Sequence, residues 1–253
     1  MTDPASIALV AAAALGGGAV NAIAGGGSLI TFPTLVAAGL APVTAAITNT
    51  VAMCPGYLGG TLAQRHDLAG QASRATKILP IAAIGGVAGA WLLLATSARM
   101  FELVVPFLLL FAALLVAVSG RLRAWLRSRI PARHAESLAI VPVGLAAIYG
   151  GYFGAGMGVI VLAALGAVID DTLTRINALK QTVSLVVNVS AAIVFLVWGP
   201  IDWTVTLVMA IGSLGGGWLG GALATRISQP LLRWTVVVIG TAVAGIYFVK
   251  LAM

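Results

Sequence analysis

The sequence predicts an all-α, polytopic helical membrane protein. Of its 253 residues, 60% are hydrophobic and 8% are charged, and the mean hydropathy is +1.08. A soluble domain carries about 25% charged residues because water must wet its surface. Long apolar runs without polar–apolar alternation argue against an outer-membrane barrel. The composition therefore excludes a soluble enzyme or a nucleic-acid-binding domain, and the net charge of +7 indicates basic loops instead.

Ten apolar runs follow one another along the chain, and most approach the roughly 20 residues that span a bilayer. They cover residues 7–24, 28–39, 43–62, 76–96, 101–119, 137–149, 159–169, 173–197, 203–224 and 231–251. The chain starts without a basic segment, so we expect the first run to be retained rather than cleaved as a signal peptide. A basic linker, residues 121–136, holds five arginines. We expect one membrane domain with an N-terminal repeat (1–120), this cytoplasmic linker and a C-terminal repeat (137–253).

Three pairs of short motifs support an internal duplication. Gly25–Gly27 matches Gly154–Gly156, Ala46–Ala52 matches Ala178–Ser184, and Ala83–Leu92 matches Ala210–Leu219, at offsets of 129, 132 and 127 residues. The matches occur in the same order in both halves. Duplicated halves are typical of secondary transporters, whose substrate site lies where the repeats meet.

Glycine clusters interrupt one apolar run in each half. The pieces that follow, residues 28–39 and 159–169, reach only about 18 Å and are too short to span. We expect re-entrant hairpins or broken helices, because irregular backbone at membrane depth must be enclosed by protein. With hairpins, each repeat keeps three spanning helices, the repeats are inverted, and 12 of the 14 basic residues share the cytoplasmic side. If each broken pair of helices crossed the membrane once, the basic residues would divide 9 to 5 between the two sides. If both short helices of each pair crossed, the 12-to-2 division would remain.

Polar groups near the glycine clusters are the candidate substrate-binding residues. Two inverted half-helices would direct their N-terminal N–H groups at one central point, which suits an anion. The candidates are Asn21, Gly25, Gly26, Gly27, Ser28, Thr48, Asn49 and Thr50 in the first half, and Gly154, Gly156, Gly158, Lys180, Gln181 and Thr182 in the second. Lys180 either serves this site or extends its ammonium to the headgroups. The amides and hydroxyls bind either substrate or neighbouring helices.

Other residues have simpler interpretations. We expect Gly85, Gly89, Gly212, Gly216 and Gly220 to allow close helix packing. The alternative for Gly25–Gly27 and Gly154–Gly158 is that these clusters also serve only close packing. Asp170 and Asp171 precede Arg175 and predict a solvated turn with an ion partner, and the alternative is a role in relaying protons. The sequence has no Walker A motif and no recognisable catalytic pair, so we expect no enzyme. No acidic residue lies mid-segment in an apolar run, so we expect no metal site and no cofactor.

The glycine-rich motifs resemble a known family. The segments NAIAGGGSLITFPTLVAAG (residues 21–39), AITNT (46–50) and GYFGAGMGVIV (151–161) together are similar to the sulfite exporter TauE/SafE family of membrane permeases. The resemblance extends over nearly the whole chain. It implies a bacterial inner-membrane permease for sulfite, sulfonates or similar small organosulfur anions. It also implies site positions at Asn49, Thr50, Gln181 and Thr182 beside the glycine turns.

We therefore expect a secondary transporter that binds a small oxyanion at two half-helix N-termini and alternates access as one repeat moves against the other. The alternative is a passive anion channel, or a carrier for another small organic anion. The expected partners are the anion and the lipid bilayer, with no nucleic acid. A coupling proton or ion and an oligomeric assembly are both compatible with this interpretation.

Overall fold

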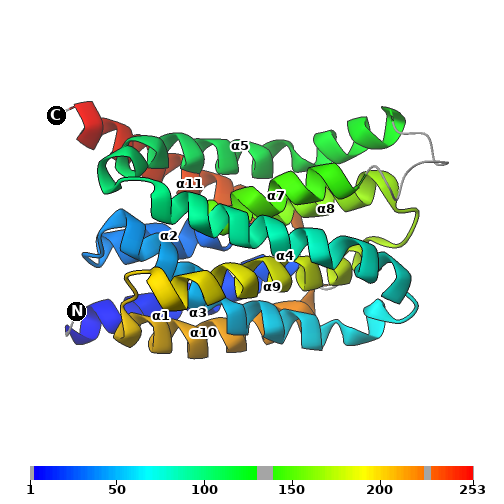
Figure 1. Cartoon of the computed structure of the whole chain (residues 1–253), viewed down its shortest axis with the longest axis horizontal. Coiled ribbons are helices and arrows are strands. Elements are labelled where there is room, and N and C mark those ends of the chain that lie inside the picture. The colour runs from blue at the N-terminus through cyan, green and yellow to red at the C-terminus, as the bar shows by residue number, and fades with distance from the viewer. Residues whose placement is uncertain (1–2, 130–138, 225–228, 253) are drawn as a thin grey trace.

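The fold is a helical bundle, seen in a computed structural model that describes residues 3–129, 139–224 and 229–252 (Figure 1). Its helices are α1 (Pro4–Ile23), α2 (Ser28–Ala37), α3 (Pro42–Ala63), the short 3-10 helix η1 (Arg65–Leu68), α4 (Ala72–Ala95), α5 (Ala98–Arg129), α7 (Ile140–Tyr152), α8 (Met157–Val168), α9 (Leu173–Trp198), α10 (Trp203–Leu223) and α11 (Gln229–Ala252). These described residues contain no strand. The all-α prediction is therefore confirmed.

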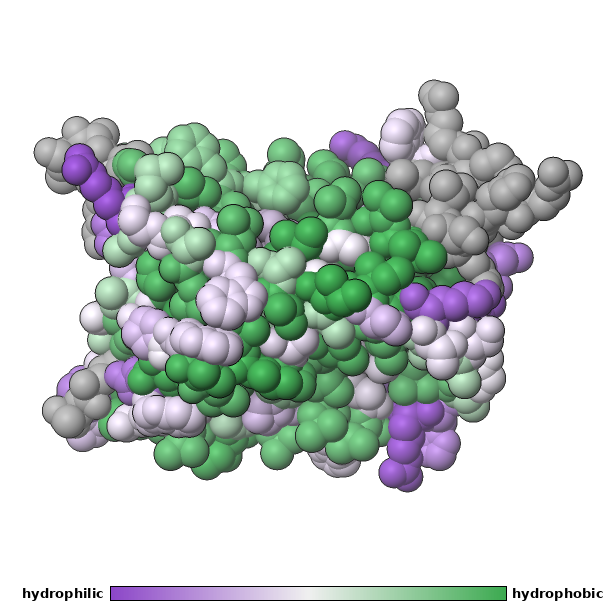
Figure 2. Space-filling view, in the orientation of Figure 1, coloured by the Kyte–Doolittle hydropathy of each residue, from purple (hydrophilic) through white to green (hydrophobic). Residues whose placement is uncertain are grey.

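The surface of the bundle is suited to lipid. Five helices are long and apolar enough to cross a membrane, namely α1, α4, residues 98–122 of α5, α9 and α10. Large apolar side chains face outward, and Ile84 and Ile211 are 70% and 77% exposed. In Figure 2 hydrophobic residues cover the middle of the visible face, while hydrophilic residues gather toward its left and right ends. The chain is therefore a multi-pass membrane protein.

The broken helices enter the bundle from opposite ends. In Figure 1, α1 begins and α11 ends at the left, whereas α5 ends and α7 begins at the right. The α1–α2 pair turns back to the left end, and the α7–α8 pair turns back to the right end. Helices α3, α4, α5, α9, α10 and α11 run between the two ends. This is the arrangement expected for two re-entrant hairpins, and the inverted duplication itself stays a prediction.

Glycines join helices that come from different halves. Helix α1 packs on α10, and α7 packs on α4. A Cβ placed at Gly216 would overlap the carbonyl of Leu15, and one at Gly89 would overlap the carbonyl of Ile148. Because glycine has no side chain, the backbones of these helices can approach closely, as predicted for the packing glycines.

The helix of the fifth apolar run extends beyond that run. The apolar run ends at Ser119, and α5 continues to Arg129. Residues 121–129 of the predicted linker are therefore helical. The reason is that arginine, leucine and alanine favour helix, and no proline follows Gly120 before Pro131. Residues 130–136 of the linker lie outside the described residues.

Candidate functional site

The glycine clusters break their helices as predicted. Helix α1 ends at Ile23 and α2 begins at Ser28, while α7 ends at Tyr152 and α8 begins at Met157. Gly25, Gly154 and Gly156 have φ angles of 84°, 79° and 77°. Residues with a Cβ rarely adopt this left-handed conformation, so glycine is required for the chain to turn here.

The two breaks meet inside the bundle. A Cβ on Gly25 would lie 2.6 Å from the carbonyl carbon of Gly158, and a Cβ on Gly158 would lie 2.8 Å from the Cα of Gly25. The N-terminal ends of α2 and α8 are therefore in backbone contact. Not even a methyl group fits at this contact, so no ligand can lie directly between Gly25 and Gly158 in this conformation.

Asparagine side chains organise the tip of α2. The Oδ1 of Asn21 accepts a 2.7 Å hydrogen bond from the backbone N–H of Gly27. From α3, the Oδ1 of Asn49 accepts a 2.5 Å bond from the hydroxyl of Thr31, and its Nδ2 donates to the hydroxyl of Ser28 over 3.4 Å. Within the described residues, the backbone N–H groups of Gly26 and Ser28 have no protein acceptor. Two donors at the positive end of α2 are therefore left for a ligand.

Lys180 lies beside this tip. Its side chain is fully buried, and its Nζ donates a 2.8 Å hydrogen bond to the backbone carbonyl of Asn21. The alternative in which the ammonium extends to the headgroups is therefore wrong for this conformation. Among the described residues, no carboxylate lies within ion-pair distance of Lys180. The buried amino group of Lys180 is thus held by a neutral carbonyl.

Gln181 and Asn21 supply further buried polar atoms. Gln181 is fully buried beside Gly60, and neither its Nε2 nor its Oε1 has a hydrogen-bond partner in the described part of the chain. The Nδ2 of Asn21 is likewise buried and unpartnered. Buried polar groups are normally satisfied, so these atoms point to a ligand or to ordered water.

Two residues of this cluster were not among the predicted site residues. The Nδ2 of Asn177 donates to the carbonyl of Ala22 at 2.9 Å and to the Oε1 of Gln64 at 2.8 Å. The Nε2 of Gln64 also approaches that carbonyl at 3.4 Å. Asn177 precedes Lys180 by three residues and shares its helix face, which is a signal that could have identified it. Gln64 follows the end of an apolar run and carries no such signal.

The predicted threonines have other partners. The Oγ1 of Thr48 accepts a 3.2 Å bond from the backbone N–H of Asp202, before α10. The hydroxyls of Thr50 and Thr182 donate to the carbonyls four residues earlier in their own helices. These contacts are bonds within and between helices. A role for the three threonines in substrate binding stays a prediction.

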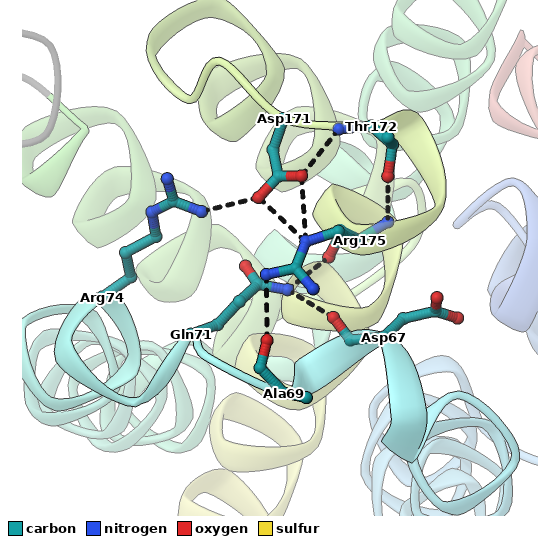
Figure 3. A network of polar contacts seen from close by, with 7 residues as sticks. All are labelled: Asp67, Ala69, Gln71, Arg74, Asp171, Thr172 and Arg175. Atoms are coloured by element: carbon teal, nitrogen blue, oxygen red, sulfur yellow. Dashed lines mark hydrogen bonds and ion pairs between the residues drawn. The ribbon is translucent and has the colours of Figure 1, made fainter.

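A polar network ties the two halves together at the end of the bundle where η1 lies (Figure 3). Asp171 lies 2.8 Å from Arg74 of α4 and 2.9 Å from Arg175 of α9. Hydrogen bonds from Arg175 and then Arg74 lower the pKa of Asp171 to about 2. The Nε2 of Gln71 adds a 3.0 Å bond to the carbonyl of Arg175. The predicted ion-paired turn is confirmed for Asp171.

Comparisons with known proteins agree on a transport role. Residues 9–247 match the family model described as sulfite exporter TauE/SafE. The "Probable membrane transporter protein YfcA" of Escherichia coli K12 is 24% identical over 245 residues, covering 97% of this chain and 90% of that protein. A "Probable membrane transporter protein" of Haemophilus influenzae is 29% identical over 87% of this chain and 85% of its own length. One of Xylella fastidiosa is 31% identical over 90% and 88%. No solved structure matches the chain significantly.

Proposed function

Because the chain belongs to the sulfite exporter TauE/SafE family, we propose that this membrane transporter is a secondary carrier for small organosulfur oxyanions such as sulfite and sulfonates. We place it in the bacterial inner membrane, with the η1 end of the bundle and the basic linker in the cytoplasm. The observation that carries the proposal is Lys180, which is fully buried and forms no ion pair with a carboxylate among the described residues. An anion is the partner that such a cation requires.

The groups around Lys180 suit an oxyanion because most of them donate hydrogen bonds. The free donors are the Nδ2 of Asn21, the Nε2 of Gln181 and the backbone N–H groups at the α2 tip. Asn21 links them, since its carbonyl accepts from Lys180 and its side chain accepts from Gly27. A sulfite or sulfonate group presents three oxygens, which can accept from several of these donors together.

Transport requires the tips to separate from their present contact. Gly25 and Gly158 touch, so a substrate would bind beside the contact or after it opens. A whole half could not move against the other without breaking the α1–α10 and α4–α7 packing. We therefore propose that helices move in groups drawn from both halves, in place of the motion of one repeat against the other.

Counterflow in liposomes tests the proposal. The purified full-length protein is reconstituted, loaded with unlabelled methanesulfonate or sulfite, and given the labelled anion outside. A carrier gives saturable uptake that internal substrate accelerates. The absence of saturable flux for both anions would contradict the proposed substrate class. Currents of channel size without this acceleration would instead support a passive channel and overturn the carrier.

Leucine substitutions at the two tips connect the flux to the site. A Cβ at Gly26 would lie 2.9 Å from a methyl of Val236, and one at Gly156 would lie 3.2 Å from the Cβ of Ala112. Gly26→Leu and Gly156→Leu are expected to reduce counterflow at least tenfold while leaving membrane insertion intact. Gly16→Leu is the matched control, because nothing lies within 4 Å of its added Cβ. Full counterflow in both tip variants would show that transport does not depend on the tips.

A further inference from the structure

Lys180 is held in surroundings that do not balance its charge. The Nζ has one hydrogen-bond partner in the described structure, the carbonyl of Asn21 at 2.8 Å. The side chain has no exposed surface. Removing a full charge from water costs more than one hydrogen bond to a neutral group returns. The ammonium form therefore needs a counter-charge, and without one the neutral amine is favoured.

The elements around α9 provide no such counter-charge. Their titratable or charged side chains are Cys54 and Tyr57 of α3, Arg65, His66 and Asp67 of η1, Arg74 and Lys77 of α4, and Tyr149 and Tyr152 of α7, while α1 and α8 have none. The loop before α9 adds Asp170 and Asp171. Asp171 is engaged by Arg74 and Arg175, and no described carboxylate bonds to Lys180.

The C-terminal end of α1 stabilises the charged form of Lys180 only partly. The carbonyls of Asn21 and Ala22 belong to the last turn of α1, the negative end of the helix dipole. Ala22 is served by the neutral amides of Asn177 and Gln64. Lys180 is thus the one ionisable group among the three side chains that cap this end, and the dipole effect is much smaller than the cost of burying a charge.

The same end of α1 leads directly to the α2 tip. Asn21 contacts Lys180 through its carbonyl and Gly27 through its Oδ1. An anion at the tip would therefore lie close to the ammonium and supply the missing negative charge. Anion binding and protonation of Lys180 then stabilise each other, which is a reciprocal linkage.

We propose that Lys180 is the proton site of a coupled carrier, so that each oxyanion crosses together with one proton. This inference rests on the proposed function. When the anion binds, the lone pair of the amine takes up a proton and an N–H bond forms. When the anion leaves on the other side, that bond breaks and the proton leaves with it. With a monovalent anion such as a sulfonate, the loaded site carries no more charge than the empty one, so transport of that anion is electrically neutral.

Neutral transport has a distinctive response to gradients. A pH difference of one unit should accumulate the anion about tenfold on the alkaline side, because one proton moves with each anion. A membrane potential of 100 mV acts on a lone monovalent anion with about 2.3 kcal/mol, which is about a 50-fold change in accumulation. The same potential should leave the accumulation of a proton–anion pair unchanged.

Radiolabelled methanesulfonate is the probe, because a sulfonate stays ionised and carries no proton of its own. Wild-type protein in liposomes is given a pH gradient or a potassium diffusion potential, and proton uptake is followed with an internal pH dye. We expect one proton per sulfonate, tenfold accumulation per pH unit and no response to potential. Sulfonate flux that follows the potential without proton movement would overturn the inference and leave the carrier standing. No sulfonate flux in any condition would contradict the proposed function for this substrate.

Variants of Lys180 separate a proton site from a purely structural lysine. Lys180→Arg keeps the charge at every pH, so we expect counterflow to persist while accumulation by the pH gradient falls from tenfold to none. Lys180→Gln should lose anion transport, whereas Lys77→Gln, at an exposed position of α4, should behave like wild type. Tenfold accumulation per pH unit in Lys180→Arg would overturn the assignment. If neither Lys180 variant inserts into the membrane, the proton-to-sulfonate ratio of the wild-type protein still tests whether one proton crosses with each anion, and a ratio of zero would overturn the inference.

Discussion

Replacing Gly25 by alanine tests the contact between the two helix tips. The new Cβ would lie 2.6 Å from the carbonyl carbon of Gly158, in a residue whose φ angle is 84°. A left-handed conformation costs a residue with a Cβ about 1–2 kcal/mol. Overpacking a tight site costs about 1–3 kcal/mol more. We therefore expect Gly25→Ala to lower the free energy of unfolding by about 2–5 kcal/mol.

Three further alanine variants separate these two contributions. Gly158 lacks the positive φ angle, so Gly158→Ala should cost only the overlap, about 1–3 kcal/mol. Gly154→Ala has a φ of 79° but only one neighbour, at 3.2 Å, so backbone strain of about 1–2 kcal/mol should dominate. Gly16→Ala has nothing within 4 Å and lies inside α1, where alanine favours helix, so this variant should be as stable as wild type or up to about 1 kcal/mol more stable.

Thermal unfolding of the detergent-solubilised variants is the assay. For a chain of this size, 1 kcal/mol corresponds to about 2–4 °C, so Gly25→Ala should melt about 10 °C below wild type. The double variant Gly25→Ala/Gly158→Ala should lose less than the sum of the single losses, because the first methyl has already separated the tips. Wild-type melting of both single variants would refute the contact. Fully additive losses would show that the two glycines do not share one space.

Three other predictions concern stability. The pKa of Asp171 is lowered from 3.8 to about 2. Its ion pairs therefore stabilise the folded state above about pH 4, and this stabilisation is lost as the pH falls toward 2. The difference in melting temperature between wild type and Asp171→Asn should narrow over that pH range. Asn177→Ala removes the closer donor to the Ala22 carbonyl and should cost about 1–3 kcal/mol in denaturant titrations. Gly216→Ala should lower the yield of folded protein in size-exclusion chromatography, whereas Gly245→Ala, with open space around it, should not.

Much of the fold could be predicted from composition and glycine position. The low charge and the apolar runs require buried or lipid-facing helices, and two runs are too short to span after their glycines. These constraints hold for any sequence in a bilayer, so the breaks at Gly25 and Gly154 followed directly. The extension of α5 to Arg129 could not be read from hydropathy, because a helix leaving the membrane keeps its hydrogen bonds while its side chains become polar.

The candidate site was less accessible to sequence reasoning. Lys180 was ambiguous because a lysine about two turns inside a helix can reach either the headgroups or the interior. Only tertiary packing, which places Asn21 opposite it, decides between these. Gln64 was missed for the same reason, since its partners Ala22 and Asn177 are 42 and 113 residues away in the chain. Contacts of that range depend on how helices cross, which local patterns do not encode.

The exchange of helices across the halves has a consequence for assembly. A polypeptide consisting of α1 to α5 alone would expose the bare ridge of α4 to lipid, and one consisting of α7 to α11 would expose that of α10. Each fragment therefore covers the packing surface that the other leaves exposed. We expect a gene cut between α5 and α7 to yield two polypeptides that are degraded when made singly and recover a common, stable complex when co-expressed.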